Sequence, residues 1–166
     1  MKTRIGQFVA LVIGASVVMG PAAASETPEE WVKLGARVHG GFGAFIPLGI
    51  RIGLDAAQTL KASPRQLSVT YYDNPKAPCA CFADGIAIAT VSSVGQRNLR
   101  IATEPAKEDA AAVIIIRPRQ GGPGLRYEIP MQALPRLAEM NKTLEPLQRY
   151  HAVMKADGLF TRADEP

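Results

Sequence analysis

Four side chains that could bind a metal ion or carry redox chemistry lie in two short stretches of this sequence. His39, one of only two histidines, lies in the glycine-rich run VHGGFGAFIPLGIRIG, Val38 to Gly53. Cys79 and Cys81 are one residue apart, and Asp84 follows three residues later. Thiolates and neutral imidazoles are preferred ligands of zinc and similar ions. These residue types predict a metal site formed by His39, Cys81 and Cys79, provided that the fold brings the two stretches together.

The glycines after His39 suggest that backbone could approach a bound ligand closely, because glycine has no Cβ. Arg51 lies in an otherwise apolar segment, where it is suited equally to a buried carboxylate and to an anionic ligand. Asp84 is suited to ligand binding and also to capping the helix that follows Cys81, and capping is the preferred interpretation. The predicted ligand pocket contains Gly40, Gly41, Gly43, Arg51 and Asp84.

The spacing of the two cysteines argues against a structural disulfide. A bridge would close a very small ring with awkward geometry, and it would remove little loop entropy from the unfolded chain. Cys81 is expected at the start of a helix, where the positive end of the helix dipole favours a thiolate. Cys81 is therefore interpreted as a metal ligand, a reactive thiol with His39 as its base, or a small buried side chain.

Hydrophobic periodicity predicts the elements that position these residues. Helices are expected over about 28–40, 47–62 and 82–91, and the region 131–155 is expected to form two helical pieces broken near Pro146. Strands are expected over 66–72, 98–103, 111–117 and 125–129, with the apolar strand 111–117 covered on both faces. The predicted fold is a single α+β domain in which helices pack against a mixed or antiparallel sheet.

The first 24 residues read as a secretory signal peptide. Lys2 and Arg4 precede an uncharged run, FVALVIGASVVM, which is followed by Pro21 and an alanine cleavage pattern. The domain is then expected over 25–166, in the periplasm or secreted, with no stable membrane insertion after cleavage. Without Lys2 and Arg4 the chain has 17 Lys and Arg against 15 Asp and Glu, so its formal charge falls from +4 to +2. A charge this mild, with few aromatic residues, argues against a nucleic-acid partner.

Two sequence blocks resemble those of the FmdE-like family, which is named after formylmethanofuran dehydrogenase. The first is His39-Gly40-Gly41-Phe42-Gly43-Ala44 with Leu48-Gly49-Ile50-Arg51, and the second is Cys81-Phe82-Ala83-Asp84-Gly85-Ile86, followed by Thr90 and Gly95-Gln96-Arg97-Asn98-Leu99. The resemblance covers about 31–116, and 117–166 would add a C-terminal hairpin and helices. It implies an α+β fold, a tendency to form homodimers, and a metal site, usually zinc, with His39 and Cys81 among its ligands.

The sequence departs from the family pattern at three positions. Gly41 stands where many members have a second histidine, Gly43 where many have a cysteine, and Ser92 near where some have another cysteine. Either Cys79, Asp84 and water complete the ligand set, or the chain no longer holds a metal tightly. The namesake enzyme's oxidoreductase chemistry rests on molybdenum or tungsten subunits, and nothing in this chain could supply that chemistry.

Three functions follow from these observations. In the first, an exported domain binds zinc, another divalent transition metal or a small ligand, and acts in binding, carriage or sensing rather than catalysis. In the second, Cys79 and Cys81 serve a thiol-based redox protein or enzyme. In the third, the chain is a non-catalytic partner subunit with a vestigial metal site.

Overall fold

The first helix, α1 (Pro28–His39), begins and ends at the signals seen in the sequence. The Thr27 hydroxyl accepts a hydrogen bond from the Glu30 backbone N–H, and the Glu30 carboxylate accepts one from the Thr27 N–H at 2.7 Å, which forms a capping box. At the other end Gly40 takes a left-handed conformation (φ 85°), which glycine adopts without steric cost. The computed structural model describes residues 26–166, and in it His39 is the last helical residue of α1.

Two further helices pack so closely that their backbones touch. These are α2 (Phe45–Thr59) and α3 (Cys81–Thr90), which cross at Gly49 and Gly85. A Cβ at Gly49 would lie 2.1 Å from the Phe82 carbonyl oxygen, and a Cβ at Gly85 would lie 2.1 Å from that of Ile46. Only glycine allows this approach, so Gly49 is a packing residue that fixes α3 against α2.

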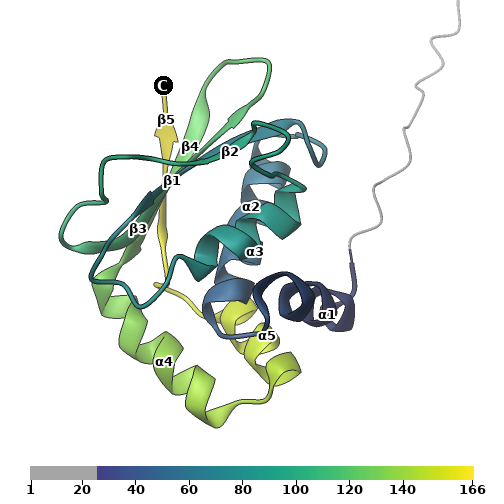
Figure 1. Cartoon of the computed structure of the whole chain (residues 1–166), viewed down its shortest axis with the longest axis vertical. Helices are drawn as coiled ribbons and strands as arrows, with labels where there is room; N and C mark the ends of the chain where they lie inside the picture. The colour runs from purple at the N-terminus through teal and green to yellow at the C-terminus, as the bar shows by residue number, and fades with distance from the viewer. Residues whose placement is uncertain (1–25) are drawn as a thin grey trace, which may run out of the picture.

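The helices pack against one mixed sheet, as the sequence predicts (Figure 1). Its strand order is β2-β1-β3-β4-β5, with β2 parallel to β1 and every other neighbouring pair antiparallel. The strands are β1 (Leu67–Asp73), β2 (Leu99–Ile101), β3 (Ala110–Pro118), β4 (Gly124–Pro130) and β5 (Thr161–Glu165). The hairpin of β3 and β4 and the positions of β1 and β2 confirm four predicted strands.

One face of the sheet forms the core, and no helix within residues 26–166 covers the other (Figure 1). The inward positions of the central strands are fully buried and align in register, as in the rows Val69–Ile116–Leu125 and Tyr71–Ile114–Tyr127. On the outer face Val113 is buried beside the loop 104–107, but Ile115 remains partly exposed. The prediction that this strand is covered on both faces is therefore wrong for Ile115, because a two-layer fold has no second helical layer.

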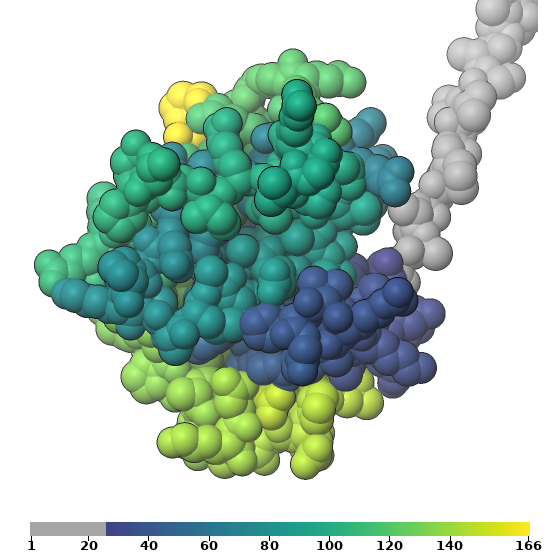
Figure 2. Space-filling view, in the orientation of Figure 1, coloured from purple at the N-terminus to yellow at the C-terminus, as the bar shows by residue number. Residues whose placement is uncertain are grey.

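In the C-terminal region, α5 (Pro146–Lys155) packs against α1. A short 3₁₀ turn, η1 (Met131–Ala133), leads into α4 (Leu134–Thr143), and α5 begins where a break near Pro146 is predicted. Figure 2 shows the α1 segment between this C-terminal part and the region of α3. The sequence analysis missed β5, a short and polar edge strand whose sequence, TRADE, carries no hydrophobic alternation.

A partly exposed polar network holds β5 in place. The Tyr127 hydroxyl donates to Asp55 Oδ2 at 2.6 Å, and Arg162 of β5 donates to both oxygens of the same carboxylate at 2.9 Å. Burial, and then the hydrogen bond to Asp55, raise the pKa of Tyr127 well above its ordinary value. Since Asp55 lies on α2, this network ties the edge strand to the central helix.

The predicted signal peptide lies outside the described residues. No helix within residues 26–166 is both long enough and apolar enough to span a bilayer.

Candidate functional site

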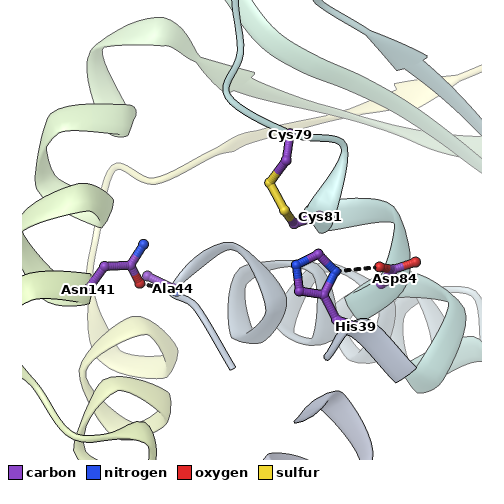
Figure 3. The surroundings of a disulfide bond; sticks show 6 residues. All are labelled: His39, Ala44, Cys79, Cys81, Asp84 and Asn141. Atoms are coloured by element: carbon purple, nitrogen blue, oxygen red, sulfur yellow. Dashed lines mark hydrogen bonds and ion pairs between the residues drawn. A yellow bond between two sulfur atoms is a disulfide. The ribbon is translucent and has the colours of Figure 1, made fainter. Parts of the chain in front are cut away.

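His39 and Asp84 join the end of α1 to the first turn of α3. His39 Nδ1 lies 2.7 Å from Asp84 Oδ2, and both side chains are partly exposed (Figure 3). With a proton on Nδ1 the ring donates to the carboxylate, which leaves Nε2 as an acceptor or a ligand. Asp84 does not cap α3, because the N-cap residue is Ala80 and no side chain caps that end. The predicted capping role is therefore wrong, and the carboxylate orients the imidazole instead.

Cys79 and Cys81 are joined in a disulfide, against the expectation from their spacing. Their Cα atoms are 5.3 Å apart, a separation that ordinary disulfides span. The bend from the loop that contains Cys79 into α3 brings the two residues this close. The small ring limits how much the bond can stabilise the fold, but it does not prevent the bond from forming.

The structure brings the disulfide and the imidazole together. Cys81 and Asp84 are three residues apart on α3, so they share one helix face, and His39 is hydrogen-bonded to Asp84. Figure 3 shows the disulfide beside the imidazole, with Nε2 on the side of the ring away from Asp84. Cys81 is buried and Cys79 is only partly buried. Through Asp84, His39 is positioned at the same end of α3 as Cys81.

The glycines around His39 form the turn from α1 into α2, and their predicted place in a ligand pocket stays a prediction. Gly40 ends α1, and a Cβ at Gly41 would meet nothing within 4 Å. Gly43 lies against Asn141 of α4, whose side-chain oxygen accepts from the Ala44 N–H at 2.6 Å (Figure 3). This loop turns the chain from α1 into α2 and is held in place by α4.

Arg149 of α5 also holds the loop between α1 and α2 in place. Its guanidinium donates to the carbonyl oxygen of Phe42, and it also donates to the carbonyls of Met140, Asn141 and Leu144. The interaction sets the position of the loop that follows His39. Nothing near Arg149 in the sequence marks this role, because its partners are carbonyl groups that every residue carries.

Among the described residues Arg51 pairs with backbone carbonyls rather than with a buried carboxylate, and its predicted binding of an anionic ligand stays a prediction. Its guanidinium donates to the carbonyls of Val153, at 2.9 Å, and Ala156, and it lies over the Phe160 ring with 5.2 Å from Cζ to the ring centroid. These carbonyls belong to the C-terminal end of α5, where a cation is favoured by the helix dipole. Arg51 is thus a packing residue between α2 and α5, away from the disulfide.

Sequence reasoning missed two buried polar groups at the end of β1. The Tyr71 hydroxyl and Asp73 Oδ1 are buried and have no hydrogen-bond partner among the described residues. Burial is the main cause of a raised Tyr71 pKa, and the nearby carboxylates of Asp73 and Asp84 raise it further. Tyr71 is fully buried. Its inward position in β1 follows from the period-2 pattern Leu67, Val69, Tyr71.

The described residues hold no group of three or more His, Cys, Asp or Glu side chains arranged to bind a metal ion. In the disulfide each sulfur is bonded to the other, so neither is a thiolate. Reduction would free two thiolates beside the imidazole. With the disulfide formed, the described residues do not fit a zinc-type ion.

Comparison with known proteins identifies one family. The family model described as "FmdE, Molybdenum formylmethanofuran dehydrogenase operon" matches residues 38–158. This span contains His39, both cysteines and Asp84; it begins within the region 31–116 in which the sequence blocks were recognised and continues past its C-terminal end. No curated protein matches the chain.

Proposed function

The chain belongs to the FmdE family, and we propose that in this member Cys79 and Cys81 form a dithiol–disulfide redox couple, with His39 as the group that transfers protons. One observation carries the proposal: the disulfide lies at the start of α3 beside a histidine that a carboxylate orients. Reactive cysteines are commonly found at helix N-termini next to a histidine. The predicted export agrees with such a couple, because disulfides persist in oxidising compartments.

The two sulfurs are not equivalent. Cys79 is the more exposed residue, so a thiolate from a reducing partner would reach it first. Cys81 is the first residue of α3, and no side chain caps the N–H groups of that turn. A Cys81 thiolate would therefore be stabilised by those donors and by the helix dipole, which makes Cys81 the better leaving group.

The exchange is balanced with a dithiol as the reductant. A donor thiolate attacks Cys79 Sγ, the Cys79–Cys81 bond breaks, and its electron pair leaves on Cys81 Sγ. The second donor thiolate then attacks the donor sulfur of the mixed disulfide and releases Cys79. The donor becomes a disulfide, and its two protons end on Cys79 and Cys81. His39 Nε2 takes a proton from the donor thiol and passes it to Cys81, while Asp84 holds the ring.

Equilibration of the full chain with glutathione buffers over a range of ratios tests this function. We expect two thiols to appear together as the buffer becomes more reducing, with a midpoint inside the range that glutathione buffers cover. A pair that stays fully reduced or fully oxidised in every buffer contradicts the proposal. In a Cys81→Ser variant a mixed disulfide with glutathione should be trapped on Cys79, and its absence there would also contradict the proposal.

A second candidate function is metal binding by the reduced protein, and the orientation of His39 favours it. Metal-binding histidines usually donate their other ring N–H to a carboxylate, as His39 Nδ1 can to Asp84. In the reduced state His39 Nε2, Cys79 and Cys81 would supply three ligands, with Asp84 behind the imidazole rather than on the metal. A zinc-type ion held there would act as a Lewis acid at an open fourth position.

Titration with Co²⁺ distinguishes the two candidates without any activity assay. If the metal function holds, reduced protein should bind one Co²⁺ and develop thiolate-to-metal absorption, while oxidised protein should not. Asp84→Asn should then weaken binding about tenfold or more, through the orientation of His39. Absence of binding by the reduced protein rules out metal binding and leaves the redox function intact. If the redox test also fails, a non-catalytic partner subunit is what remains.

A further inference from the structure

We propose that a hollow at the other end of α3 binds the oxyanion group of a small molecule, one that carries at least two negative charges. The hollow, about 400 Å³ in volume, lies where α2 ends, β1 begins and β3 ends. Three cationic side chains and two amides line it, and we call this set the basic hollow: Lys61, Arg65, Gln66, Arg119 and Gln120. No carboxylate lines it.

The charges of the basic hollow are not neutralised within the protein. Among the described residues no ion pair involves Lys61, Arg65 or Arg119, although other exposed cations, such as Arg162 with Asp55, are paired. Like charges that line one hollow repel one another, and a bound anion would remove that repulsion.

Arg119 is held in position over the hollow. Its guanidinium donates to the carbonyl oxygen of Arg65 and to that of Gln96, both at 3.4 Å. These bonds use two of its five donors, and the remaining N–H groups are available to a ligand. A positioned guanidinium is well suited to phosphate or carboxylate, since it offers two parallel hydrogen bonds.

The amide of Gln66 is oriented by a hydrogen bond of its own. Its Oε1 accepts from the Ser63 N–H at 2.9 Å. With the oxygen engaged, the Nε2 group is left as a donor. The hollow is therefore lined by cations and by at least one amide that favours an acceptor ligand.

The backbone of the two loop cations is unusual. Lys61 and Arg65 have φ values of 50° and 71°, in the left-handed region that favours glycine. Lys61 follows α2 at the position where such helices commonly end in glycine, and the Ala62 N–H bonds back to the Ala57 carbonyl. Strained residues of this kind gather at functional sites, and the backbone itself gives no reason for a lysine there.

If the cations of the basic hollow served only to stabilise the fold, the hollow would be expected to look different. Helices α2 and α3 both end near the basic hollow, and cations stabilise helix C-termini through the dipole. That role needs positive charge near the carbonyl groups but no space between the cations. The hollow has the size of a small-molecule site, and no hydrogen bond from the Lys61 ammonium or the Arg65 guanidinium to a helix carbonyl is present among the described residues.

The test measures binding of inorganic pyrophosphate and of citrate to the full chain by calorimetry, at low ionic strength. The two probes distinguish a phosphate-bearing from a carboxylate-bearing ligand, and saturable binding of either one supports the proposal. Lys61→Gly and Arg65→Gln should each weaken binding at least tenfold, because each removes a charge-assisted contact. No saturable binding of either probe to the unmodified protein overturns the proposal.

Two control variants make the result specific. Val91→Gly replaces another residue in the left-handed conformation, at φ 50° at the end of α3, without changing charge. Lys142→Gln removes one exposed positive charge on α4, outside the basic hollow. Both should bind the probes as the unmodified protein does. A loss of affinity in Lys142→Gln equal to that in Lys61→Gly would mean that net charge alone attracts the anion, and it would overturn the site.

Discussion

The two ends of α3 carry opposite chemistry. At its first residue, sulfur, an imidazole and a carboxylate gather where the helix dipole is positive. At its last, Lys61, Arg65 and Arg119 surround a hollow where the dipole is negative. A helix of ten residues rises about 15 Å, so the two sites are close but separate.

The difference between the ends shows what makes a site visible in a sequence. Cys79, Cys81 and Asp84 are neighbours in the chain, so one stretch already suggests chemistry. The basic hollow draws on residues more than fifty positions apart, and lysine and arginine are common surface residues. Both ends depend on the same support, the crossing of α2 and α3 at Gly49 and Gly85.

The largest loss of stability is expected when the close crossing of α2 and α3 is disrupted. Gly85→Ala should destabilise the protein by about 3 kcal/mol or more, because its Cβ would lie 2.1 Å from the Ile46 carbonyl oxygen and the helices would have to separate. Chemical denaturation measures the change. Gly41→Ala is the matched control and should be nearly neutral, since nothing lies within 4 Å of its Cβ. Equal stability of the two variants would mean that the helix crossing does not support the ends.

The next largest effect is expected on the rate of disulfide reduction, and it should depend on the histidine at the start of α3 but not on the other histidine. His39→Ala should slow reduction of the disulfide by dithiothreitol about a hundredfold near neutral pH, because proton transfer is lost. Its stability should change by less than about 1 kcal/mol, as is usual for an exposed ion pair. His151→Ala changes the other histidine, which is exposed on α5, and should leave the rate unchanged. Equal rates in all three proteins would remove His39 from the mechanism.

A smaller change in stability is expected when the hydroxyl groups of two buried tyrosines are removed. Tyr127→Phe should cost about 1 kcal/mol, because the hydrogen bond to Asp55 is lost. Tyr71→Phe should be neutral or stabilising, since it removes a buried hydroxyl that has no partner among the described residues. If Tyr71→Phe costs as much as Tyr127→Phe, the Tyr71 hydroxyl does have a hydrogen-bond partner, and the Asp73 carboxylate, which raises the Tyr71 pKa, is the group expected to accept from it.

The same pair predicts how stability depends on alkaline pH. The pKa values of Tyr71 and Tyr127 are both raised in the folded state, mainly by burial. The unfolded chain then loses these protons first, so their contribution is complete below pH about 10 and is lost as the pH rises further. The free energy of unfolding should fall above that pH, and less steeply in Tyr127→Phe. An equal slope in that variant would contradict the assignment.

The smallest effect is expected at the basic hollow, near the end of α3, where a substitution should raise the stability of the protein rather than lower it. Lys61→Gly should stabilise the protein by up to about 1 kcal/mol, because glycine adopts the left-handed conformation without strain. Thermal unfolding in the absence of anions measures it. A stabilised variant that no longer binds pyrophosphate would show that the lysine serves binding at the expense of stability. A destabilised variant would instead indicate that its charge supports the helix end.

Much of the fold was predictable because its signals are local. The capping box at Thr27 and Glu30, the glycine after His39 and the alternation in β1 lie within a few residues of the structure that they specify. The strand β5 was not predictable, since its place depends on Arg162 meeting Asp55 more than a hundred positions away. Asp84 was misassigned for the same reason: its partner, His39, is forty-five positions distant.

The sequence by itself determined the class of the fold, the family and the residue types from which the site at the start of α3 is built. Only the tertiary structure decided which atoms meet: a disulfide in place of two free thiols, a carboxylate on the imidazole, and Arg51 on helix carbonyls. It also revealed the basic hollow. The physical reason is that local sequence specifies backbone conformation, whereas contacts between distant side chains are set by how helices and strands pack.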